Sequence, residues 1–215
     1  MGCTESRESA GSQRHVYVSR SICFSYYFFG ALASRSLYSF IVSHYNMSQS
    51  LHACCRFNPP LQIVQNILEL LPESLSLVDL MHRTPLHIAA GTRANLSIIQ
   101  LLVNASPLTC AVRDVDGKTP LHLACDSTCE LFVGDEDCTR DPPTYDVLST
   151  LIEAYLPALS LDDNEGTSAL EHAILSDAPI KIVKYLQGVT RQQNQIKALS
   201  DQLESTRIGE SQPLL

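Results

Sequence analysis

The chain has 215 residues and a formal net charge of −8 at pH 7, which suits one domain with tails. Residues 1–50 carry four Arg against two Glu, so they are net +2 and the rest of the chain is net −10. Because phosphate contacts need Lys and Arg, we expect no nucleic-acid partner. The sequence has no zinc-finger spacing, no glycine-rich phosphate loop and no nucleophile elbow.

The amino terminus carries a lipidation motif. Residues 1–6 match the N-myristoylation pattern M-G-x-x-x-[ST], with Gly2 as the acylated residue. One myristoyl chain binds membranes with a constant of only about 10⁴ per molar, so stable anchoring takes a second signal. Palmitate on Cys3 would supply that signal. We therefore predict acylation of Gly2 and Cys3 and contact with membrane lipid; the alternative is an accidental match.

The rest of the segment 1–49 contains an apolar stretch at 22–33, rich in Phe and Tyr. It is too short for a membrane span, which needs about 20 residues. A span extended to Val42 would contain Arg35, and inserting an Arg at the centre of a membrane helix costs roughly 2.5–3.5 kcal/mol. Two alternatives stay open. The stretch could be the core of a signal peptide, which would take the domain out of the cytosol, or an artefact of the gene model.

The next segment is built from repeats. Thr-Pro-Leu-His-Ile-Ala-Ala at 84–90 recurs 35 residues later as Thr-Pro-Leu-His-Leu-Ala-Cys at 119–125. The same step backward lands on His52. A step forward finds residues 166–173, where Glu171 replaces the His and the spacing has grown to 49. An identical tetrapeptide at a fixed offset indicates duplication of a supersecondary unit.

Each unit reads as two helices. Thr84 and Thr119 are predicted N-caps, each followed by Pro at the first helical position. Gly117 is predicted to have a positive φ in the turn before the cap, and His82 holds that position in the preceding unit. Apolar residues at i, i+3 and i+4 then predict a second, amphipathic helix in each unit, at 61–71, 96–103, 147–153 and 180–186.

These units resemble ankyrin repeats, two strongly and two in degenerate form. The resemblance implies an all-α solenoid of stacked helix-turn-helix units with short hairpin-like fingers. It covers residues 50–188, as units at 50–79, 82–112, 117–161 and 166–188. In this family the Thr and His of the motif hold neighbouring repeats together by hydrogen bonds. That implies structural roles for Thr84, His87, Thr119 and His122.

The resemblance also implies a function. Ankyrin repeats bind protein partners and seldom catalyse, so we expect a non-enzymatic adaptor or scaffold with no cofactor. Partner contacts are expected at the finger tips, on Met81, His82, Arg83, Val115, Asp116, Lys118, Asn164 and Glu165. The alternative is a soluble cytosolic or nuclear regulator or inhibitor without membrane attachment. No catalytic triad or carboxylate pair stands out from the repeat pattern, which disfavours an enzyme.

The cysteines raise the question of a metal. Cys54, Cys110 and Cys125 lie at or beside core positions, where a free thiol behaves as a small hydrophobe and suits a reducing compartment. One conceivable set of zinc ligands is His122, Cys125, Cys129 and Cys138. The spacing Cys-x3-Cys-x8-Cys fits no common structural zinc pattern, so we expect no metal.

An insertion at about 126–143 interrupts the third unit and holds six acidic residues and one Arg, which predicts an exposed loop. Its acidic run at 135–137 lacks the ligand spacing of a calcium loop. Pro-Pro-Thr-Tyr at 142–145 resembles a ligand of WW domains. The alternative is that these prolines start a helix and Tyr145 takes a core position equivalent to Leu96.

Residues 189–215 form a polar carboxyl-terminal helix and tail. Val189, Gln192, Ile196, Leu199 and Leu203 follow a 3–4 spacing. The run is under three heptads, which is short for a coiled coil, so we expect a helix that caps the last repeat.

The chain ends in Glu-Ser-Gln-Pro-Leu-Leu, which resembles an acidic dileucine sorting signal made of Glu210, Leu214 and Leu215. Such a signal would contact clathrin-adaptor subunits, and it makes sense only on a membrane-attached protein that faces the cytosol. We therefore expect the cytosolic face of a membrane, in the endolysosomal or vacuolar system, with the cytoplasm as the alternative.

Overall fold

A computed structural model describes residues 50–128, 131–132 and 141–209. In these residues the regular structure is helical, apart from one isolated β-bridge between Asp162 and Ser168. The all-α solenoid expected from the sequence is therefore confirmed. No helix within the described ranges is long and apolar enough to cross a membrane.

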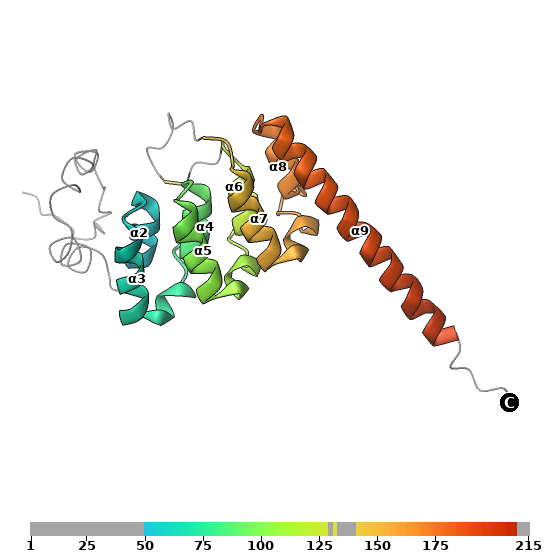
Figure 1. The fold of residues 1–215 in the computed structure, drawn as a ribbon, viewed down its shortest axis with the longest axis horizontal. Coiled ribbons are helices and arrows are strands. Elements are labelled where there is room, and N and C mark those ends of the chain that lie inside the picture. The colour runs from blue at the N-terminus through green and yellow to red at the C-terminus, as the bar shows by residue number, and fades with distance from the viewer. Residues whose placement is uncertain (1–49, 129–130, 133–140, 210–215) are drawn as a thin grey trace, which may run out of the picture. The chain divides into compact units, whose positions relative to one another are not determined.

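The helices form two layers of a stack (Figure 1). The inner layer contains α2 (Ser50–Phe57), α4 (Pro85–Gly91), α6 (Pro120–Cys125) and α8 (Ala169–Leu175). The outer layer contains α3 (Leu61–Leu70), α5 (Leu96–Ala105), α7 (Tyr145–Ala154) and the start of α9 (Ile180–Gly209). Short 3₁₀ turns follow the first three outer helices: η3 (Pro72–Leu75), η4 (Pro107–Ala111) and η5 (Leu156–Ser160). Each inner helix packs on the next one and on its own outer helix.

The inner helices begin where the Thr-Pro motif predicts. Thr84 and Thr119 are N-caps in extended conformation, and Pro85 and Pro120 are the first helical residues. Proline fits there because its missing N–H would have no intrahelical partner. In α8 the cap is Ser168, which forms a reciprocal capping box with Glu171, so the Glu that replaces His still closes the helix start.

The core lies between the two layers. Leu86 and Leu121 are fully buried, as are Ala89 and Ala124 on the neighbouring inner helices α4 and α6, which pack on each other. Small side chains at such positions permit close packing, which an added methylene would disturb. The three thiols expected in the core, Cys54, Cys110 and Cys125, are buried and free, and Cys55 is buried and free beside them.

The last helix differs from expectation. In place of a separate capping helix, α9 runs unbroken from Ile180 to Gly209. The boundary predicted at 188/189 falls inside it, where Gly188 is accommodated within the helix at a cost of about 1 kcal/mol relative to Ala. Its first turns contact α8 and η5, and side chains beyond residue 193 are exposed as far as Leu203.

Candidate functional site

The fingers are built from one repeated aspartate turn. In each finger an Asp Oδ1 accepts hydrogen bonds from the backbone N–H groups two and four residues later, at 2.8–3.0 Å, and the three residues are Asp79, Asp114 and Asp163. The residue three positions after each Asp has a positive φ: 58° at His82, 78° at Gly117 and 79° at Gly166. The predicted roles of His82 and Gly117 are confirmed. The local turn leaves the two residues after each Asp at the tip.

Neighbouring fingers are joined along their tips. The Val115 N–H donates to the Met81 carbonyl at 3.0 Å, and the Asn164 N–H donates to the Asp116 carbonyl at 2.9 Å. The Asn164 side-chain amide adds a 2.9 Å bond to the Val115 carbonyl. Main-chain bonds therefore fix the spacing of the tip side chains from one repeat to the next.

We call the exposed residues of these tips the finger edge: Leu80, Met81, His82, Val115, Asp116, Asn164 and Glu165. Its first part is apolar, because Leu80 is 93% exposed and Met81 and Val115 stand beside it. Its second part carries the exposed carboxylates of Asp116 and Glu165. Leu80 was missed by the sequence reasoning, although it occupies the tip position that follows Asp79.

Two of the predicted contact residues are engaged inside the protein. The Arg83 guanidinium pairs with Asp79 at 2.8 Å and donates to the Leu131 carbonyl at 2.7 Å. Lys118 Nζ pairs with Asp126 Oδ2 at 3.0 Å. Arg83 and Lys118 therefore help to hold the fold. The side chains available at the finger edge are the other six predicted residues and Leu80.

The motif histidines form a ladder between repeats. His87 Nδ1 accepts from the Thr84 N–H at 3.0 Å, so Nε2 carries the proton and donates to the Lys118 carbonyl at 3.2 Å. His122 does the same between the Thr119 N–H, at 3.2 Å, and the Leu161 carbonyl, at 3.0 Å. The structural roles implied by the family resemblance are confirmed for all four residues. Burial lowers the pKa of His87 and His122 to about 4.

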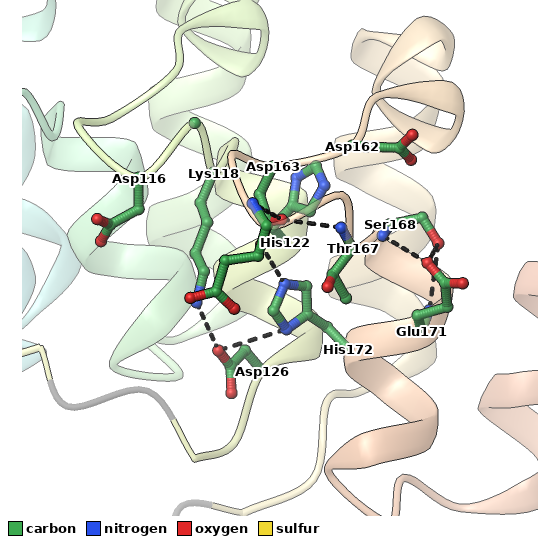
Figure 2. Close-up of polar contacts among 12 residues, drawn as sticks. Asp116, Lys118, His122, Asp126, Asp162, Asp163, Thr167, Ser168, Glu171 and His172 are labelled. Carbon is green, nitrogen blue, oxygen red and sulfur yellow. Dashed lines mark hydrogen bonds and ion pairs between the residues drawn. The ribbon is translucent and has the colours of Figure 1, made fainter.

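A buried charged network lies beneath the finger edge in the third and fourth repeats (Figure 2). His172 Nε2 is 2.8 Å from Asp163 Oδ2, and His172 Nδ1 is 3.6 Å from the Asp126 carboxylate that pairs with Lys118. Burial opposes ionisation of Asp126, but hydrogen bonds from Lys118 and Thr128 outweigh it and lower the pKa. Burial of Asp163 is likewise outweighed, by its backbone N–H partners and His172, and its pKa is lowered.

Sequence reasoning missed this network. The available signal was His172, which takes the place held by the apolar residues Ile88 and Leu123 in the two preceding repeats. A polar residue at a core position needs a partner, and Asp163 is the finger aspartate of the same repeat. The network ties α8 to its own finger and, through Asp126, to the end of α6.

The insertion is not simply an exposed loop. Leu131 is buried against Gly91, and the ring of Phe132 lies 3.7 Å from the Arg56 guanidinium carbon and 5.3 Å from that of Arg83. These cation–π contacts bring the insertion across the first two repeats. The expectation of an exposed loop was therefore wrong at Leu131, and Phe132 is half-buried.

Arg93 closes the insertion at its base. Its Nε donates to the Asp141 carbonyl at 2.9 Å, and Nη2 donates to the Asp126 carbonyl at 3.4 Å. Its Nη1 bonds the Ala124 carbonyl at 2.5 Å. One guanidinium on the second repeat thus binds the backbone at both ends of the insertion, and we call this contact the Arg93 clamp.

The Pro-Pro-Thr-Tyr motif is partly packed away. Pro142 and Pro143 line a pocket of about 340 Å³ with Arg93, and Pro143 is buried. Tyr145 is not at a core position, because it is 53% exposed and its ring packs at a tilt against Tyr185 of α9, with 4.5 Å between ring centroids. A WW domain would have to unpack Pro143 before it could bind this motif.

His122 and Cys125 are poorly suited to bind zinc. Both ring nitrogens of His122 are hydrogen bonded, and burial raises the pKa of the Cys125 thiol to about 12. No group of three or more His, Cys, Asp or Glu among the described residues could hold a metal ion. Cys129 and Cys138 lie outside the described residues, as do the proposed lipidation residues Gly2 and Cys3 and the sorting-signal residues Glu210, Leu214 and Leu215.

Comparison with known families identifies the repeats. A family model described as ankyrin repeats, in three copies, matches residues 51–140. No curated protein matches the sequence. The fourth helix pair, α8 and the start of α9, lies outside the matched range but packs on the third repeat and on η5. Residues 51–140 are therefore ankyrin repeats, which indicates a protein–protein interaction domain in this part of the chain.

Proposed function

We propose that this protein is a non-enzymatic adaptor that binds a protein partner along the finger edge and is held at the cytosolic face of a membrane by acylation of Gly2 and Cys3. The finger edge carries the binding part of the proposal. Its apolar residues stand next to exposed carboxylates, and hydrogen bonds between neighbouring fingers fix their spacing. A rigid edge loses little conformational entropy on binding, so more of its contact energy becomes affinity.

The chemistry of the edge specifies the kind of partner. Leu80, Met81 and Val115 would bury apolar side chains of the partner, and Asp116 and Glu165 would attract Lys or Arg beside them. Asp162, which lies close to Glu165 in the sequence, is also exposed and adds a carboxylate to this acidic end. We therefore expect a protein segment in which apolar residues are followed by basic ones.

The binding test is a pair of variants in the full chain with an intact amino terminus. Leu80→Asp with Val115→Asp is expected to abolish recovery of the partner found by proximity labelling with the wild-type chain. Leu108→Asp is the matched control, because Leu108 is also highly exposed but lies on η4. Equal recovery by the finger-edge variant and the wild type would refute binding at this edge.

The membrane part rests on sequence motifs outside the described residues. Labelling with a myristate analogue should mark the wild type and not Gly2→Ala, and Cys3→Ser should be labelled but released from membranes, since one chain anchors only marginally. If the wild type is not labelled, the membrane part of the proposal fails, and the protein would be a soluble cytosolic or nuclear regulator that binds its partner through the finger edge.

We further propose that Glu210, Leu214 and Leu215 contact a clathrin adaptor and direct the protein to endolysosomal or vacuolar membranes. Replacing Leu214 and Leu215 by Ala should then redistribute it.

A further inference from the structure

The carboxyl-terminal half of α9 exposes an apolar stripe. Near the helix start Ile182 and Leu186 are buried against the stack, but Ile196 is 57% exposed and Leu199 is 61% exposed. In proteins most helical stability comes from the packing of an apolar face. The apolar side chains of this part of α9 are exposed, so this face is available to a further partner.

The stripe follows a seven-residue repeat. Ile182, Val189, Ile196 and Leu203 fall at one heptad position, a, and Gln192 and Leu199 fall at position d. We call this stripe the α9 seam: the half-buried Val189 and the exposed Gln192, Ile196, Leu199 and Leu203. Since the helix is continuous through Gly209, all five residues lie on one helix. Apolar residues at a and d are the pattern of a coiled coil.

Charges are placed on the side away from this seam. Arg191, Lys197 and Asp201 occupy the outer positions c, b and f. Between Val189 and Leu203 the flanking positions e and g hold neutral residues, which are Gln193, Gln195, Ser200 and Gln202, and the next e position is Arg207. Charges at e and g normally decide which partner a coiled coil accepts. Neutral flanks create no repulsion when the helix meets an identical copy.

We propose that the α9 seam pairs in parallel with the α9 seam of a second copy of this chain, as a short two-stranded coiled coil that begins near Val189. In a parallel pair each d residue faces its own copy, so the two Gln192 amides can hydrogen bond to each other. An antiparallel pair would set Gln192 against an apolar residue and leave its amide buried without a partner, which costs free energy. The dimer would carry two finger edges, so a partner with two binding segments would bind by avidity.

The seam is short, so the dimer should be weak and visible in the micromolar range. Sedimentation velocity on the full chain, from low micromolar to the highest soluble concentration, should show a monomer–dimer equilibrium. Ile196→Asp with Leu199→Asp should remove it, and Lys197→Glu on the outer face should not. Gln192→Leu should tighten the association, because it removes a polar group from the seam. Thermal unfolding of each variant checks that the repeat stack stays folded.

Three results would overturn the proposal: a wild type that stays monomeric, a double Asp variant that associates as tightly as the wild type, or equal disruption by Lys197→Glu. Association through residues 1–49 would survive the double Asp change and so would be recognised. For the orientation, a photo-crosslinking amino acid at Gln192 should join residues 189–196 of the second copy. Crosslinks confined to residues 199–203 would mean antiparallel pairing.

Discussion

His172 donates from Nε2 to the Asp163 carboxylate at 2.8 Å, and this bond joins the fourth inner helix to the finger that precedes it. In the earlier repeats the equivalent side chains, Ile88 and Leu123, are buried and apolar. The fourth repeat thus replaces a packing contact by a buried polar one. A group of this kind stabilises the fold only while its partner is in place.

Asp163→Asn tests that bond. The amide oxygen of Asn can still accept from the Glu165 and Thr167 N–H groups, so the finger turn is kept while the charged acceptor for His172 is lost. We expect the free energy of unfolding to fall by about 1–3 kcal/mol in urea denaturation. His172→Ala should cost a similar amount, and the double variant should cost less than the sum. Additive losses would mean that the two side chains are not coupled.

The two finger glycines form a matched pair for measuring the contact between fingers. A Cβ at Gly117 would lie 2.5 Å from Asn164 Oδ1 and 2.9 Å from the Asn164 nitrogen, whereas a Cβ at Gly166 would meet nothing within 4 Å. The φ angles are nearly equal, 78° and 79°. Gly166→Ala should therefore cost only the left-handed strain, about 1–2 kcal/mol. Gly117→Ala should cost clearly more, and equal losses in urea denaturation would argue against a tight contact there.

The histidine ladder predicts acid sensitivity. Burial lowers the pKa of His87 and His122 from 6.5 to about 4, so between these values the unfolded chain binds protons that the folded chain does not. The contribution of these two histidines to the free energy of unfolding should therefore be fully present above pH 6.5. It should decline as the pH falls toward 4. Each group contributes up to roughly 3 kcal/mol to this decline. His87→Gln should flatten the profile, and a wild type equally stable across this range would contradict the prediction.

The Arg93 clamp can be tested by proteolysis. Arg93→Met keeps the aliphatic stem but removes the donors to the Asp126 and Asp141 carbonyls. A protease that does not cut at Arg should then cleave within residues 126–143 faster than in the wild type. Arg93→Lys should fall in between, because an ammonium cannot present the planar fork of a guanidinium. Unchanged cleavage in Arg93→Met would show that other contacts hold the insertion.

The sequence could predict those features that depend on residues close together in the chain. The caps at Thr84 and Thr119 and the left-handed residues His82 and Gly117 depend on hydrogen bonds and sterics within four or five residues. Those rules act on any chain with the same local sequence, so the repeats, their order and the finger positions could be predicted.

The features that could not be predicted join residues far apart in the chain. Arg83 bonds the Leu131 carbonyl 48 residues away, and nothing near either residue announces the contact. The continuity of α9 was missed for a different reason. A change from apolar to polar side chains marks where packing ends, and a helix can continue past that point, as this one does beyond Gly188.

The Arg93 clamp has a practical consequence. Because one side chain on the second repeat binds the backbone at both Asp126 and Asp141, the chain is held by the stack itself where it enters and leaves the insertion. A fluorescent or affinity module placed between Phe132 and Asp141 would add mainly loop-closure entropy, about 0.6 kcal/mol for each doubling of loop length. This position offers a fusion site within the chain that leaves both termini unmodified.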